Sequence, residues 1–227
     1  IEGSPNSING LVSILNTHAI TVDASLSVDQ LTINTGGSII IATGQTLTIV
    51  DDGTAASDLI NTGAITTTGS LAISNNATYQ HNIGTGLPTA TWSVGSTCLV
   101  TGIVAQTSLA NTQQSFHHFA WNCPSQTGTL NLTLIGTIAV PTTFTFNGDF
   151  SLVNTGTGKI RFASISGTEN KTIAITGNLN ISGGTLETTG IIMLDVIISF
   201  IREYSYIGVF LIVCLESGIF FPLPDVT

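Results

Sequence analysis

The chain has 227 residues, a net charge of −9, and only 7% charged residues. Intrinsic disorder is excluded, because it is typical of chains with low hydrophobicity and high net charge per residue. Four basic residues cannot form the cationic cluster that a phosphate backbone requires, so we expect no nucleic-acid partner. The polar residues are mainly Thr, Ser, Asn and Gly, which suit strands and tight corners better than helices.

Apolar pairs recur every eight residues in the N-terminal part of the chain. The pairs are Leu31/Ile33, Ile39/Ile41 and Leu47/Ile49. Within each pair the alternation has a period of two, which places both side chains on one face of a strand. The segments between pairs are rich in Gly, Asn and Thr, and these residue types tolerate left-handed backbone at corners. The rhythm returns at Ile173/Ile175 and Leu179/Ile181.

This pattern predicts an all-β domain over residues 1–192, built as a right-handed parallel β-helix, or β-solenoid. Three strands of about eight residues would give a coil of about 24 residues, and about eight coils would stack at about 4.8 Å. An antiparallel β-sandwich is the alternative, because regular short strands with turn signals also describe that fold.

The segment 79–124 departs from the rhythm and is the part of the domain that looks specialised for binding. No aromatic residue precedes Tyr79. The candidate binding residues are Trp92, Phe116, His117, Phe119 and Trp121. Aromatic faces suit sugar rings, so one interpretation is a carbohydrate-binding surface, and the other is a local core. Cys98 and Cys123 flank part of this segment and form either a disulfide or two buried free thiols.

Three groups of polar residues could carry chemistry. Asp51, Asp52 and Asp58 offer carboxylates for calcium, although a solvated corner explains them better. Lys159 and Arg161 share a strand face, as in some polysaccharide lyases, or form a plain exposed face. The adjacent His117 and His118 should point to opposite faces of a strand, which disfavours a shared metal. We therefore expect no catalytic residues, no metal, no cofactor and no enzymatic activity.

Residues 193–227 differ in composition from the rest of the chain. The segment begins at the only methionine, Met193, and Leu, Ile, Val and Phe replace the Thr, Asn and Gly corners. The run Ile207–Leu215 is shorter than the roughly 20 apolar residues of a spanning helix. The composition predicts a hydrophobic helical tail, through which alone the chain would contact a membrane.

This tail resembles the N-terminus of the DedA family of integral membrane proteins. The resemblance rests on Tyr206-Ile207-Gly208-Val209-Phe210, Glu216-Ser217-Gly218 and Pro222-Leu223-Pro224. The family is associated with moving lipid carriers across membranes, and the resemblance implies that Glu216 is its acidic position. A fragment of such a transporter is therefore one alternative function. The composition break at Met193 fits either a joined sequence or a genuine fusion.

The part of the chain before the tail resembles repeat-rich secreted bacterial surface proteins. The resemblance rests on Ala90-Thr91-Trp92, on Gly95-Ser96-Thr97-Cys98 and on Phe119-Ala120-Trp121-Asn122-Cys123-Pro124. It implies a non-catalytic structural or adhesive module, located outside the cell or on its surface, with glycans or other surface components as partners. A carbohydrate-binding or polysaccharide-active β-helix is the alternative function for this region.

Overall fold

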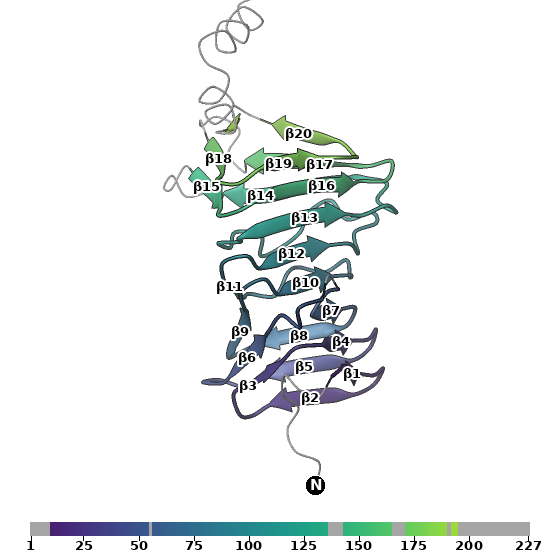
Figure 1. Ribbon diagram of the computed structural model, residues 1–227. Helices are drawn as coiled ribbons and strands as arrows, with labels where there is room; N and C mark the ends of the chain where they lie inside the picture. Colours follow the sequence, from purple (N-terminus) through teal and green to yellow (C-terminus); the bar gives the residue numbers. More distant parts are fainter. Residues whose placement is uncertain (1–9, 55, 136–142, 165–170, 190–191, 195–227) are drawn as a thin grey trace, which may run out of the picture.

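The computed structural model describes residues 10–54, 56–135, 143–164, 171–189 and 192–194. Within these ranges the protein is all-β, and every strand pairing is parallel. The parallel pairing confirms the all-β prediction and excludes the antiparallel sandwich as the architecture of these residues. The strands stack into an elongated ladder, with the N-terminal strands at one end (Figure 1).

One sheet runs along the whole ladder, and we call it the long sheet. Its eight strands, in spatial order, are β1 (Val12–Ile14), β4 (Leu31–Ile33), β7 (Leu59–Asn61), β10 (Thr78–His81), β12 (Thr97–Val100), β13 (His118–Asn122), β16 (Phe150–Asn154) and β19 (Leu179–Ile181). Spatial order follows chain order, so each coil of the chain adds one strand to this sheet. The eight strands agree with the predicted eight coils.

Two pairs of shorter sheets complete the coils. Sheet 2 contains β2 (Ala19–Val22), β5 (Ser38–Ile41) and β8 (Ala64–Thr67). Sheet 3 contains β3 (Leu26–Val28), β6 (Thr46–Ile49), β9 (Ser70–Ile73) and β11 (Thr91–Trp92). Farther along, sheet 4 contains β14 (Thr129–Ile135), β17 (Lys159–Ser164) and β20 (Leu186–Thr189). Sheet 5 contains β15 (Thr143–Phe146), β18 (Lys171–Ile175) and β21 (Ile192–Leu194).

The length of a coil varies more than the sequence predicts. Val12 pairs with Leu31, 19 residues later, whereas Phe119 pairs with Phe150, 31 residues later. The predicted constant coil of about 24 residues is therefore wrong in detail. The strands keep register because the inward apolar pairs align, while the corners between strands absorb the differences in length.

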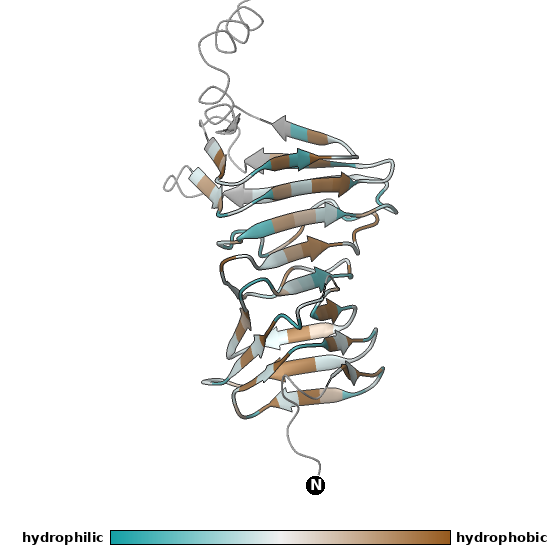
Figure 2. Cartoon of the chain, in the orientation of Figure 1, coloured by the Kyte–Doolittle hydropathy of each residue, from teal (hydrophilic) through white to brown (hydrophobic). Residues whose placement is uncertain are grey.

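The inward residues of the repeated pairs form the core. Ile33, Ile41 and Ile49 are completely buried, and each sits on a different sheet of the same coil. Apolar segments recur in the strands along the length of the ladder (Figure 2). The period of two in the sequence thus predicted the core positions correctly in the N-terminal coils.

Close packing at the corner between the long sheet and sheet 2 requires glycine. A Cβ atom on Gly63 would lie 2.3 Å from the carbonyl oxygen of Gly37, and one on Gly37 would lie 2.8 Å from that of Ile14. Real Cβ atoms essentially never come so close to backbone oxygen, so successive corners stack tightly only because no side chain is present.

The change of rhythm at 79–124 suggested an interruption of the ladder, but the long sheet continues through this segment. β10, β12 and β13 pair in register in the long sheet, with Tyr79 opposite Cys98 and Cys98 opposite Phe119. The interruption is confined to the other two sides of the coil. Sheet 2 ends at β8 and sheet 3 ends at β11, and sheets 4 and 5 begin only after β13.

The C-terminal predictions lie mostly outside the described residues. This applies to Glu216 and to almost all of the predicted helical tail. At the start of that tail, Met193 pairs with Thr172 within β21, so the β-ladder continues past the predicted boundary at residue 192. In the part of the chain that the structure describes, no helix has the length and apolar character needed to cross a membrane.

Candidate functional site

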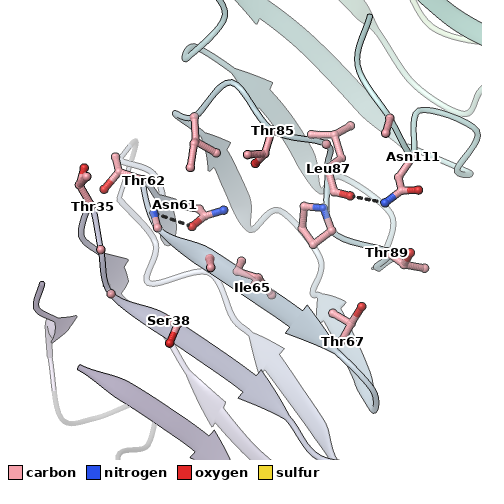
Figure 3. A pocket seen from close by; sticks show the side chains of 18 residues that line it. Thr35, Ser38, Asn61, Thr62, Ile65, Thr67, Thr85, Leu87, Thr89 and Asn111 are labelled. Carbon is pink, nitrogen blue, oxygen red and sulfur yellow. Dashed lines mark hydrogen bonds between the residues drawn. The ribbon is translucent and has the colours of Figure 1, made fainter. Parts of the chain in front are cut away.

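An open groove of about 730 Å³ lies beside β8 (Figure 3). It is formed by the corner after β4, the corner and strand around β8, and the segment between β10 and β11. The lining residues are Thr35, Gly36, Gly37, Ser38, Asn61, Thr62, Gly63, Ala64, Ile65, Thr67, Ile83, Thr85, Gly86, Leu87, Pro88, Thr89, Ala110 and Asn111. None of them is charged, titratable or aromatic.

The groove lies along the edge of β8 where a strand from the next coil would complete sheet 2. The amide of Ala64 donates to the carbonyl oxygen of Gly37, over 3.0 Å, in the direction of β5. Along a strand, the backbone amide and carbonyl groups of successive residues point alternately to the two neighbouring strands. Ala64 and Thr66 therefore bond to β5. The amide and carbonyl groups of Ile65 and Thr67 point away from β5, and no described strand pairs with them.

Side-chain burial shows the same open edge. Ile39 on β5 is 3% exposed, because β2 and β8 flank its strand. Its register partner Ile65 on β8 points to the same side but is only partly buried. The apolar side chain of Ile65 therefore packs against the core and also lines the groove.

The opposite wall of the groove consists of residues 85–89, which are attached to the following coil instead of to β8. The amide of Leu87 donates to the carbonyl oxygen of Ala110 over 3.1 Å, and its carbonyl accepts from the Asn111 side chain over 2.8 Å. The Gln114 side chain donates to the carbonyl of Pro88 and accepts from the amide of Ala90. This segment contains Gly86 and Pro88, and proline has no amide to donate to a ladder.

A buried hydrogen-bond chain fixes the floor of the groove. The Asn61 amide donates to the Tyr79 hydroxyl over 3.2 Å, and this hydroxyl lies 2.8 Å from Nδ1 of His81. Nε2 of His81 lies 2.9 Å from the carbonyl oxygen of Thr85. Burial raises the pKa of Tyr79 far above its usual value and lowers that of His81, so both are neutral at pH 7. The chain joins β7 and β10 to the groove wall.

The predicted aromatic surface is not a surface. Phe116, Phe119 and Trp121 are all completely buried. They could stack on a sugar only if the core opened, so the structure as described places them as core residues. Trp92 is partly buried, and its indole NH donates to the Gln114 side chain over 3.1 Å. The alternative prediction, a local core, describes their positions.

Cys98 and Cys123 are both buried free thiols in the structure, which corresponds to the second of the two predicted states. Cys98 pairs in register with Phe119, while the Cys123 thiol donates to the carbonyl oxygen of Val100 over 3.4 Å. Burial raises the pKa of Cys98 well above its usual value and that of Cys123 to about 11. Thiolate, the reactive form, is therefore scarce at both residues.

His117 and His118 do not point to opposite faces. Their ring centroids are 4.5 Å apart in an edge-to-face arrangement. His117 lies before the first residue of β13, so the alternation of side chains along a strand does not apply to it. Nδ1 of His118 accepts from the amide of Asp149 over 2.9 Å. Nδ1 of His117 is buried and has no hydrogen-bond partner among the described residues. Both rings pack against Gly148, where any Cβ atom would clash with them.

The carboxylates of Asp51, Asp52 and Asp58 do come together, with one oxygen from each lying within 4.8 Å of the others. Asp58 is 2% exposed, and it accepts from the amides of Asp52 and Thr78 over 3.1 and 2.7 Å. Its burial raises its pKa, while hydrogen bonds from Thr54 lower the pKa of Asp52. These hydrogen bonds brace a corner, but the burial of Asp58 differs from the predicted solvated corner.

Lys159 and Arg161 share a face, as predicted, and both pair with one carboxylate. Glu187 lies on the neighbouring strand β20 and accepts from Nζ of Lys159 over 2.5 Å and from Arg161 over 2.9 Å. The two cations lower the pKa of Glu187. This closed arrangement is an ion-pair network along a sheet, and it leaves no free base beside an open groove.

Comparisons with protein-family models, with curated proteins and with solved structures find no match for this chain. The groove was not among the sites predicted from the sequence. Its signal is visible in hindsight at Gly84, Gly86 and Pro88, which interrupt the position where the next strand of sheet 2 belongs.

Proposed function

We propose that the β region is a non-catalytic structural and adhesive module of a secreted or cell-surface protein, built as a right-handed β-solenoid. Parallel strands joined by crossovers are right-handed in almost all proteins, which supports the handedness. Its partners would be glycans or other components of cell surfaces.

The observation that carries this proposal is the outward face of the long sheet. Residues in register along all eight strands form one uncharged row of small polar and aliphatic side chains. The row is Ser13, Thr32, Ile60, Gln80, Leu99, Ala120, Ser151 and Asn180. A long, uncharged row of regular spacing suits broad contact with another surface, because little charge has to be desolvated along it.

The lining of the groove supports the non-catalytic part of the proposal. Cleavage of a polysaccharide needs a positioned acid and base or nucleophile next to the bound sugar. The 18 lining residues include no carboxylate, histidine, lysine or arginine. The buried titratable groups near the groove, Tyr79 and His81, are committed to the hydrogen-bond chain that holds its floor.

The adhesive role is tested with latex beads coated with the full chain. Their retention under flow is measured on glass, on protein-coated surfaces and on a panel of polysaccharide films. Albumin-coated beads give the background. We expect retention above background on at least one surface, with no release of reducing or unsaturated sugar from the films.

Two matched variants locate the adhesive face. Ala120 on the long sheet and Ala72 on sheet 3 both point outward and are both partly buried. Ala120→Glu places a charge in the middle of the proposed face and should reduce retention, whereas Ala72→Glu adds the same charge elsewhere and should not. Retention at background on every surface, equal loss in both variants, or sugar release would each refute the proposal.

A further inference from the structure

We propose that the groove between β8 and residues 85–89 binds an extended peptide segment, which adds to the free edge of β8 as a further strand of sheet 2. This interaction goes beyond the adhesive role of the long sheet. It uses a different face of the molecule and is tested separately.

The edge of β8 offers the hydrogen-bonding groups that a strand needs. The amides and carbonyls of Ile65 and Thr67 face the groove, as the register with β5 requires. Proteins usually protect such edges with lysine, proline, a bulge or a covering segment. β8 reads Ala-Ile-Thr-Thr and carries none of those residues, and the segment that should cover it bonds to the next coil.

The side chains of the groove define the chemistry of the peptide. On β5, Ile39 packs below Ile65, and an added strand would place its own inward residue above Ile65 in the same row. That residue should be apolar, because its neighbours Ile65 and Leu87 are apolar. The whole lining is uncharged, so the segment should carry no charged residue at its inward positions.

A peptide fits the groove better than a sugar does. Free main-chain groups on either side of a half-buried isoleucine match the alternation of backbone and side chain along a strand. Sugar rings are usually bound against exposed aromatic faces, and the lining has no aromatic residue. A neutral oligosaccharide is therefore the competing outcome in the test.

The probe is a peptide that copies residues 62–68 of the chain itself, acetylated, amidated and labelled with a fluorophore. Binding to the full chain is measured by fluorescence anisotropy. Two further peptides are N-methylated at alternate amides, one at the odd and one at the even positions. A strand presents only one of these sets to β8, so one methylated peptide should bind roughly tenfold or more weakly and the other should bind like the parent.

Two variants at one position separate backbone from side-chain recognition. Thr67→Pro removes an amide that faces the groove and is not used by β5, so the variant should fold. It should lose peptide binding, whereas Thr67→Ala keeps the amide and should bind the peptide like the parent chain. Circular dichroism and thermal unfolding check that both variants are folded.

The proposal is wrong if the peptide does not bind, if both methylated peptides bind equally, or if a neutral hexasaccharide binds in its place. The methylated pair decides the question on the unmodified chain even if Thr67→Pro does not fold. If the beads are retained but the peptide does not bind, the peptide-binding proposal is refuted and the adhesive proposal stands. Peptide binding without bead retention supports the groove and refutes the adhesive role.

Discussion

At the scale of single residues, the most informative group is His81. The carbonyl oxygen of Thr85 can only accept a hydrogen bond, so Nε2 of His81 must carry a proton. In the neutral ring Nδ1 is then an acceptor, and the Tyr79 hydroxyl donates to it while accepting from Asn61. A second proton on His81 would remove that acceptor. The floor of the groove therefore depends on a neutral histidine.

This dependence predicts a loss of stability in mild acid. Burial lowers the pKa of His81, and burial together with the neighbouring His117 lowers the pKa of His118 against the opposing effect of Asp149. The unfolded chain takes up protons near pH 6.5, before the folded chain does. Stability should be full above that pH and should fall as pH drops through 6.5 towards the lower folded-state values. Urea unfolding between pH 5.5 and 8 measures this slope.

The variants His81→Gln and His118→Gln show how much each histidine contributes to the dependence of the unfolding free energy on pH. Each should be less stable than the parent at pH 8 but should show a smaller decrease on acidification, and the double variant should show the smallest decrease. The Asp58 carboxyl, whose pKa is raised by burial, contributes with the opposite sign, and its effect is common to all four chains. Parallel slopes in all four chains would show that neither histidine is the source.

At the scale of elements, Phe116 fills the core between sheet 3 and sheet 5, where no described strand connects them. It belongs to no strand, but its ring centroid lies 5.0 Å from that of Trp92 on β11 and 6.4 Å from that of Phe146 on β15. Its carbonyl accepts from the amide of Asn147 over 3.0 Å. Sheet 3 ends at β11 and sheet 5 begins at β15. The rings of Trp92, Phe116 and Phe146, which we call the aromatic column, continue the core across the junction between these two sheets.

Truncation of this side chain should therefore be costly. Phe116→Ala should lower the free energy of unfolding by about 3–5 kcal/mol, because it leaves a cavity between two sheets with no strand to close it. Val94→Ala is the control, since Val94 is 70% exposed. Equilibrium unfolding in urea measures both changes. A loss at Phe116 no larger than that at Val94 would mean that the column does not support the junction.

The sequence predicted the elements with regular spacing and missed the irregular ones. Ile33, Ile41 and Ile49 were predicted as core because alternation of period two depends only on neighbouring residues. The role of Phe116 depends on Trp92 and Phe146, which lie 24 and 30 residues away, and no local pattern encodes that proximity. The free edge of β8 was missed for the same reason. It exists because residues 85–89 bond to the next coil and do not pair with β8.

The same limit explains the misassigned aromatic segment. A cluster of aromatic residues after a region without any resembles a binding patch in composition. The direction in which each ring points is set by strand register, with Phe119 opposite both Cys98 and Phe150 in the core. Register is a property of the stacked coils, so composition alone could not separate a patch from a core.

At the scale of the whole molecule, the ladder consists of two blocks. Sheets 2 and 3 belong to the coils of β1–β11, and sheets 4 and 5 belong to those of β14–β21. The long sheet and the aromatic column are continuous across the junction, and residues 107–112 bond both to Leu87 in the first block and to β14 in the second. In stacked-coil proteins each coil contacts mainly its neighbours, so stability is a sum of local terms and can differ between blocks.

Native-state hydrogen exchange tests this division with one core truncation per block. Leu47→Ala should lower amide protection in β1–β9 and leave β16–β17 almost unchanged, because its contacts stay within the first block. Phe162→Ala should have the reverse effect, since Phe162 packs on Phe150 in the second block. Phe116→Ala should lower protection in both. If Leu47→Ala lowers protection uniformly along the chain, the ladder opens as a single cooperative unit and the division into two blocks is wrong.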